Sequence, residues 1–97
     1  MTIATLVRDD GDPCRIAGEL SFDTVNALWA SIAARFKSGT KLVLDLAGAT
    51  HCDSAGLAFL IECVRTARAN HVTLEFLSPP AQLLALASAS HVADVIF

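Results

Sequence analysis

The sequence predicts an α/β domain with a mixed sheet of about four strands and helices packed on it. Short runs of alternating or continuous apolar residues, typical of strands, are separated by runs in which apolar residues recur at helical spacing. Strand–helix–strand repeats imply right-handed crossovers and parallel neighbouring strands, after an antiparallel start. A chain of 97 residues has room for a single core, so we expect one domain over residues 1–97.

Two short strands are predicted at the start of the chain. Residues 2–8 are rich in strand-forming side chains and end in a strong turn signal, DDGDP, at residues 9–13. An alternating pattern resumes over residues 14–20. The two runs together predict a β-hairpin.

A first helix is predicted from residue 23, where the apolar period changes. Ser21 or Asp23 can cap it, because a short oxygen-bearing side chain accepts from the free N–H groups of a first turn. Gly39 ends it. Trp29 lies on the apolar stripe and is most simply a core residue. The stripe consists of Val25, Leu28, Trp29, Ile32 and Phe36.

The rest of the chain alternates strands with helices. Nearly continuous apolar character over residues 41–46 predicts a central strand with both faces covered. The further expectations are a loop over 47–52, a helix over about 54–70, a strand over 72–77, and a helix that opens at Pro79-Pro80 and runs through Ala89. Residues 91–97 leave two alternatives open, a last helical turn or a short strand.

Composition narrows the function classes. Hydrophobic residues are 54% of the chain and charged residues 18%, against about 25% charged in an average soluble domain. Such an apolar chain can keep some apolar surface for a partner. The net charge of −3 and the lack of a basic cluster argue against nucleic-acid binding.

Location is predicted to be cytoplasmic. No run approaches the ~20 apolar residues that span a bilayer, and the N-terminus lacks the features of a signal peptide. Three cysteines without a C-x-x-C pair indicate reduced thiols. We therefore expect no direct membrane insertion.

The stretch HCDSAGLAFLI at residues 51–61 places an acid, a hydroxyl and a glycine before an apolar helix. Asp53 or Ser54 can be its N-cap. Gly56 removes a side chain from the first turn, so another surface can approach the backbone. Free N–H groups and the helix dipole would stabilise a phosphoryl group on Ser54, and that charge would disrupt docking of an apolar surface. Capping alone remains an alternative.

The apolar arc of this helix is wider than one sheet contact needs. Leu57, Leu60 and Ile61 suit the sheet, while Phe59 and Cys63 widen the arc. Two explanations stay open. Another helix of the domain covers the excess, or the excess is a partner surface beside Ser54.

Catalysis and metal binding are not predicted. His51, His71 and His91 have no metal-ligand spacing, and the sequence has no nucleophile elbow or glycine-rich phosphate loop. An enzyme with Cys52 or Ser54 as nucleophile would lack a base at any recognisable spacing. We expect no enzyme activity, no cofactor and no metal.

The order of these motifs resembles the STAS domain (sulfate transporter and anti-sigma factor antagonist). The resemblance is carried by GEL at residues 18–20, LVLDL at 42–46 and DSAGL at 53–57, and it covers nearly the whole chain. It implies a mixed sheet with helices and no intrinsic catalysis. Ser54 matches the serine that a partner kinase phosphorylates in anti-sigma factor antagonists, so it is a possible phosphoacceptor. The expected partner-binding residues are Asp53, Ser54, Ala55, Gly56, Leu57, Phe59 and Cys63.

Two subtypes compete within this family. GELSFD at residues 18–23 and LW at 28–29 resemble MlaB-type proteins. That subtype implies a small cytoplasmic subunit of an ABC transporter for phospholipid trafficking and outer-membrane lipid asymmetry. The subunit would bind the ATPase, and through it the permease, at the inner membrane, with Ser54 needed for docking and not for phosphorylation. The alternative is an anti-sigma factor antagonist that an anti-sigma factor kinase regulates by phosphorylating Ser54.

Overall fold

A four-stranded mixed sheet in the order β1-β2-β3-β4 organises the fold. The computed structural model describes residues 5–7, 14–92 and 96. β1 (Thr5–Val7) pairs antiparallel with β2 (Cys14–Leu20), whereas β2, β3 (Lys41–Cys52) and β4 (Thr73–Leu77) run parallel. The predicted fold class, a mixed sheet of about four strands with helices on it, is therefore confirmed.

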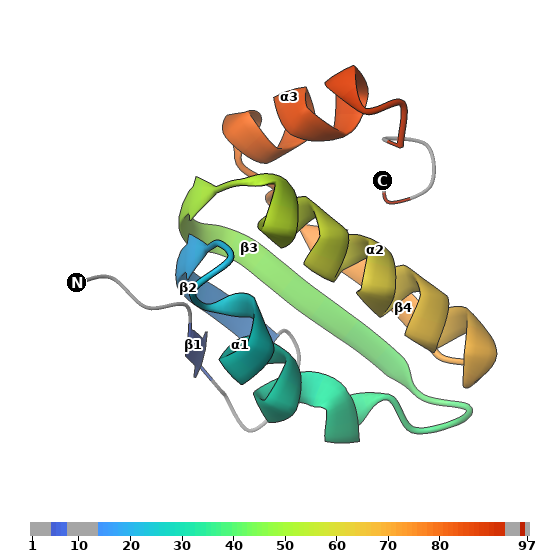
Figure 1. Cartoon of the computed structure of the whole chain (residues 1–97). Helices are drawn as coiled ribbons and strands as arrows, with labels where there is room; N and C mark the ends of the chain where they lie inside the picture. Colours follow the sequence, from blue (N-terminus) through green and yellow to red (C-terminus); the bar gives the residue numbers. More distant parts are fainter. Residues whose placement is uncertain (1–4, 8–13, 93–95, 97) are drawn as a thin grey trace.

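Three α-helices complete the described chain. They are α1 (Val25–Ile32), which continues into a 3-10 turn, η1 (Ala33–Arg35), then α2 (Ser54–Ala69) and α3 (Ala81–Ala89). α1 and α2 lie side by side on one face of the sheet, and α3 lies against the end of β3 and the start of α2 (Figure 1). Within the described residues, no helix is long and apolar enough to cross a membrane.

β3 is longer than the sequence pattern indicated, and the predicted loop over residues 47–52 was wrong. That segment continues the strand and pairs with β2 as far as Cys52. Its pairing shifts register twice, between Arg15 and Ala17 and between Gly18 and Glu19 of β2. Each shift places an extra residue in β3, as in a β-bulge, so the two-residue alternation that marks a strand is interrupted there.

β3 is central, as predicted, but the expectation that both of its faces are covered was only partly right. The alternation along β2 is one-sided, with Cys14, Ile16 and Leu20 buried and Arg15 exposed. On that same outer face Asp45 is half-buried and Glu75 is exposed. α1 and α2 therefore cover one face (Figure 1), and the other face of the described sheet carries charged side chains.

The start of α1 differs from the predicted caps. Thr24 is the N-cap residue, and no side chain makes a capping hydrogen bond. The Thr24 hydroxyl instead donates to Glu19 O at 2.8 Å and accepts from Ser21 N at 3.0 Å, which holds the turn between β2 and α1. The Ser21 hydroxyl is buried and has no hydrogen-bond partner among the described residues. The predicted apolar stripe is confirmed, since Leu28, Ile32 and Phe36 of it are buried.

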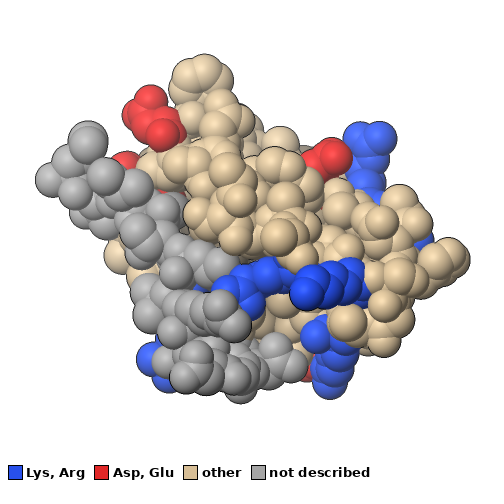
Figure 2. Space-filling view, turned by 90° about the horizontal axis from the view of Figure 1, so that it is seen from below, with Lys and Arg blue, Asp and Glu red and all other residues tan. Residues whose placement is uncertain are grey.

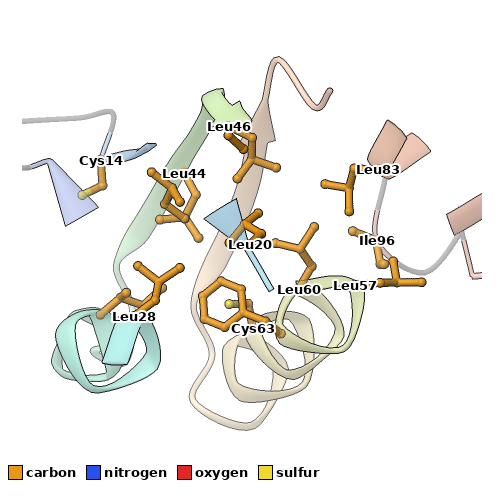
Figure 3. Packing of buried hydrophobic residues seen from close by; sticks show 14 of the residues in the cluster. Cys14, Leu20, Leu28, Leu44, Leu46, Leu57, Leu60, Cys63, Leu83 and Ile96 are labelled. Atoms are coloured by element: carbon orange, nitrogen blue, oxygen red, sulfur yellow. The ribbon is translucent and has the colours of Figure 1, made fainter. Parts of the chain in front are cut away.

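The core lies between the covered sheet face and the helices. Leucines of β2 and β3 point toward side chains of α1, α2 and α3 (Figure 3). Residues with no more than 1% exposure include Leu20, Leu44, Leu60 and Leu83. Apolar burial of this kind is the main favourable term in folding, and here it comes from every layer of the fold.

The ends of the chain are described only in part. Residues 2–4 and 8 of the predicted first strand and its turn at 9–13 lie outside the described residues. Near the C-terminus, Ile96 is buried and its N–H donates to Val92 O at 3.2 Å, an i to i−4 bond. This bond favours the helical alternative for the tail over the strand.

Candidate functional site

Asp53 fixes the start of α2. Its Oδ1 accepts from Ala55 N at 2.9 Å and from Gly56 N at 3.1 Å, so it is the N-cap. Its backbone N–H donates to Leu20 O at 3.2 Å. The cap that the sequence left between Asp53 and Ser54 is therefore Asp53, and it ties α2 to the end of β2.

The second carboxylate oxygen of Asp53 reaches the neighbouring loop. Its Oδ2 accepts from Phe22 N at 3.2 Å, in the turn between β2 and α1. Partial burial raises the pKa of the Asp53 carboxyl. Hydrogen bonds from the backbone of Gly56, Phe22 and Ala55, with an electrostatic effect of His51, outweigh this burial, so the pKa lies below its ordinary value. One ionised side chain thus joins the start of α2 to the turn that leads into α1.

Ser54 is the first residue of α2 and is exposed to solvent. Three amides of the first turn are already bonded, since Ala55 and Gly56 donate to the Asp53 side chain and Leu57 N donates to Asp53 O at 3.1 Å. These three amides are therefore not free to bind a phosphoryl group on Ser54, and its stabilisation by free N–H groups stays a prediction. The hydroxyl itself is available to a partner.

Gly56 allows close packing inside the domain. A Cβ atom at this position would overlap the carbonyl oxygen of Leu20 and lie 3.0 Å from Leu20 Cβ. The surface that approaches this glycine, which the sequence left unidentified, is the end of β2. Glycine is needed here because any side chain would push α2 away from the sheet.

The seven expected partner-binding residues divide into two groups. Ser54 is exposed, and Asp53 and Ala55 are half-buried. The other four are buried, and their exposed fractions are at most 5% for Leu57, Phe59 and Cys63. Of the two explanations for the wide apolar arc, coverage within the domain accounts for Phe59, whose ring meets Trp29 edge-on at a centroid distance of 6.1 Å.

An open groove of about 310 Å³ runs between α1 and α2, and its α2 wall begins at Ala55, the residue after Ser54. Trp29, expected to be core, is only half-buried and forms part of this groove. Phe59 also lines the groove although its side chain is almost fully covered. The groove between α1 and α2 is lined by Val25, Asn26, Trp29, Ala55, Ala58, Phe59 and Glu62.

Phe22 is a surface residue that the sequence reasoning missed. Its side chain is 79% exposed, although its backbone is held by Asp53. A large aromatic side chain so open to water is unusual, and such residues mark interaction surfaces when other apolar groups lie near them. The available signal was an aromatic residue placed between Ser21 and Asp23 in a polar turn.

The cysteines and histidines near the site do not assemble reactive groups. Burial, and to a lesser degree the charge of Asp53, raises the pKa of the Cys52 thiol. Burial does the same for Cys63, with a smaller effect of Glu62. A raised pKa keeps a thiol protonated and a poor nucleophile. No group of three or more metal-ligating side chains occurs within the described part of the chain.

Fold and site together define an α/β domain that presents a fixed helix start and a neighbouring groove. A family model described as "Mlab, STAS domain" matches residues 7–96, and the chain belongs to the STAS domain family. STAS domains are protein-interaction domains and are generally non-catalytic. No curated protein matches the sequence.

Replacing Asp53 by alanine is expected to lower the free energy of unfolding at neutral pH by about 0.5–2 kcal/mol, the usual effect of losing an N-cap. Because the folded-state pKa is below the unfolded one, this contribution is present above the unfolded pKa and is lost as pH falls through the folded pKa. Urea unfolding of the wild type and Asp53→Ala at neutral and acidic pH measures both effects. A difference that does not shrink in acid would contradict the assigned role.

Proposed function

We propose that this chain is a non-catalytic, MlaB-type interaction subunit of an ABC transporter for phospholipid trafficking. It acts in the cytoplasm and binds the ATPase subunit, and through it the permease, by the surface that begins at Ser54. The family description and the resemblance of residues 18–23 and 28–29 to MlaB-type proteins support this subtype. In this role the domain supports the assembly and activity of the transporter.

The observation that carries the proposal is the position of Ser54. Ser54 is exposed and directly precedes Ala55, which lines the groove between α1 and α2, and the helix start is held by the hydrogen bonds that Ala55 N and Gly56 N donate to Asp53. A contact residue on a rigid helix start binds without first being ordered, which limits the entropy lost on association.

The geometry does not favour the alternative role as an anti-sigma factor antagonist. A phosphoryl group on Ser54 would stand beside the carboxylate of Asp53, and the amides of Ala55 and Gly56 that would otherwise receive it are bonded to Asp53. The negative charges of the phosphoryl group and of the Asp53 carboxylate would repel each other. Docking through an unmodified Ser54 hydroxyl brings no second negative charge next to Asp53.

Site-specific cross-linking tests the proposed contact. Cys14, Cys52 and Cys63 are all buried, so Ser54→Cys provides the accessible thiol for a maleimide–benzophenone label. We expect light to join the labelled chain to the transporter ATPase in the native complex. Thr73→Cys on the exposed edge of β4 is the matched control and is expected to give no ATPase adduct. An adduct from position 73 and none from position 54 would refute the proposal.

A further inference from the structure

We propose that the partner fills the groove between α1 and α2 with one apolar side chain that is flanked by lysine or arginine. The inference rests on the proposed function and specifies the chemistry of its docking site. The size of the groove and the charges around it carry the inference.

The groove has the dimensions of a site for a protruding side chain. At about 310 Å³ it is at the lower end of the range for small-molecule pockets, about 300–1,000 Å³. It is open along one side, and its lining is largely apolar, with the rings of Trp29 and Phe59 meeting edge-on. Phe22, whose side chain is exposed, is held through its backbone N–H by Asp53, the N-cap of the helix that forms one wall. Anchors of interfaces are commonly single apolar or aromatic side chains inserted into such pockets.

The charges around the groove are acidic. Among the described residues, Glu62 is the one charged residue in its lining. Asp53 caps the helix that forms one wall, and exposed Asp23 lies in the turn that leads into the other. Arg65 approaches Glu62 at 3.6 Å, but both side chains are at least half exposed, so the pair is weak and easily exchanged. A basic partner surface complements this rim.

Apart from Arg65, several basic side chains of the described residues lie toward the other end of the domain. β2 and β3 are parallel and end together, with Leu20 opposite Cys52, so α1 and α2 begin at one end of the sheet and finish at the other. Arg35 and Lys37 follow α1, and Arg68 lies in the last turn of α2. Seen from below, where α1 ends, lysine and arginine side chains gather across the middle of the molecule (Figure 2). This charge separation orients a basic partner toward the groove during approach.

A second copy of the chain is a poorer occupant. A symmetric dimer would place the same patch of each copy against the other, and Glu62, Asp53 and Asp23 of the two rims would then face one another. Like charges across an interface suppress pairing. The acidic residues around the groove therefore favour a partner other than a second copy of this chain.

Titration of the purified full-length chain with the transporter ATPase tests the inference. We expect the Kd to rise at least fivefold for Glu62→Lys, and the wild-type Kd to rise with NaCl concentration because opposite charges are screened. Glu75→Lys makes the same charge change on β4, where Glu75 pairs with Lys41 at 3.5 Å, and is expected to change the Kd less than twofold. Glu62→Gln, a milder change, is expected to fall between the wild type and Glu62→Lys.

The outcomes separate the two proposals. Binding by the wild type that is independent of salt, or equal effects of Glu62→Lys and Glu75→Lys, would overturn the basic partner and leave the proposed function standing. Failure of the wild type to bind the ATPase at all would overturn both. Concentration-dependent dimerisation of the wild type that Glu62→Lys strengthens would identify a second copy as the occupant and overturn the inference.

Discussion

Gly56→Ala is expected to destabilise the domain by about 1–3 kcal/mol, the usual range for a side chain forced into a well-packed core. The added Cβ would overlap the carbonyl oxygen of Leu20. That oxygen cannot move away freely, because it accepts the hydrogen bond from Asp53 N that ties α2 to β2. The helix propensity of alanine, better than that of glycine by about 1 kcal/mol, acts in the opposite direction. The midpoint of urea unfolding measures the net change.

Ser54→Ala is the matched control for this prediction, since it changes the same helical turn without adding an atom to the contact with β2. The cap of α2 is made by the Asp53 side chain, and Ser54 is exposed, so the expected change in stability is within about 0.5 kcal/mol. A Gly56→Ala protein as stable as the wild type would show that α2 can shift on the sheet. The close packing would then not determine where the site stands.

Ser54→Trp is expected to lower the affinity for the ATPase at least tenfold, about 1.4 kcal/mol. The indole would project from an exposed position that precedes Ala55 of the groove, where it does not disturb the core. Recovery of the ATPase on the tagged chain measures the loss. Ala69→Trp places the same side chain at the exposed last residue of α2 and is expected to leave recovery unchanged. Equal recovery with Ser54→Trp and Ala69→Trp would place the contact elsewhere.

Most elements of the fold could be predicted because each has a regular apolar period. β2 and α2 begin where the pattern placed them, at Cys14 and Ser54. The second half of β3 could not be predicted, because two bulges interrupt its alternation and the small residues Ala47 and Gly48 are typical of a loop. Gly48 is nevertheless suited to the strand, since a Cβ there would lie 3.2 Å from Ala17 Cα. Pairing between strands distant in sequence determines that segment.

The N-cap of α2 could be predicted from the sequence, whereas the groove between α1 and α2 could not. An acid followed by a hydroxyl before an apolar run indicates a helix start, and Asp53 is that cap. The groove joins residues some thirty positions apart, such as Trp29 and Phe59, so no local pattern reveals it. No local pattern reveals the burial of Cys63 either, because it depends on the packing of α2 against both the sheet and α1.

Recovery of partners on the tagged wild-type chain, purified with its native complex from detergent-solubilised cells, tests the central claim most directly. We expect the transporter ATPase and permease to be recovered with the wild-type chain, and we expect folded Ser54→Trp to recover neither. Purification of the wild-type chain without the ATPase or the permease would contradict the claim that this STAS domain is a transporter subunit.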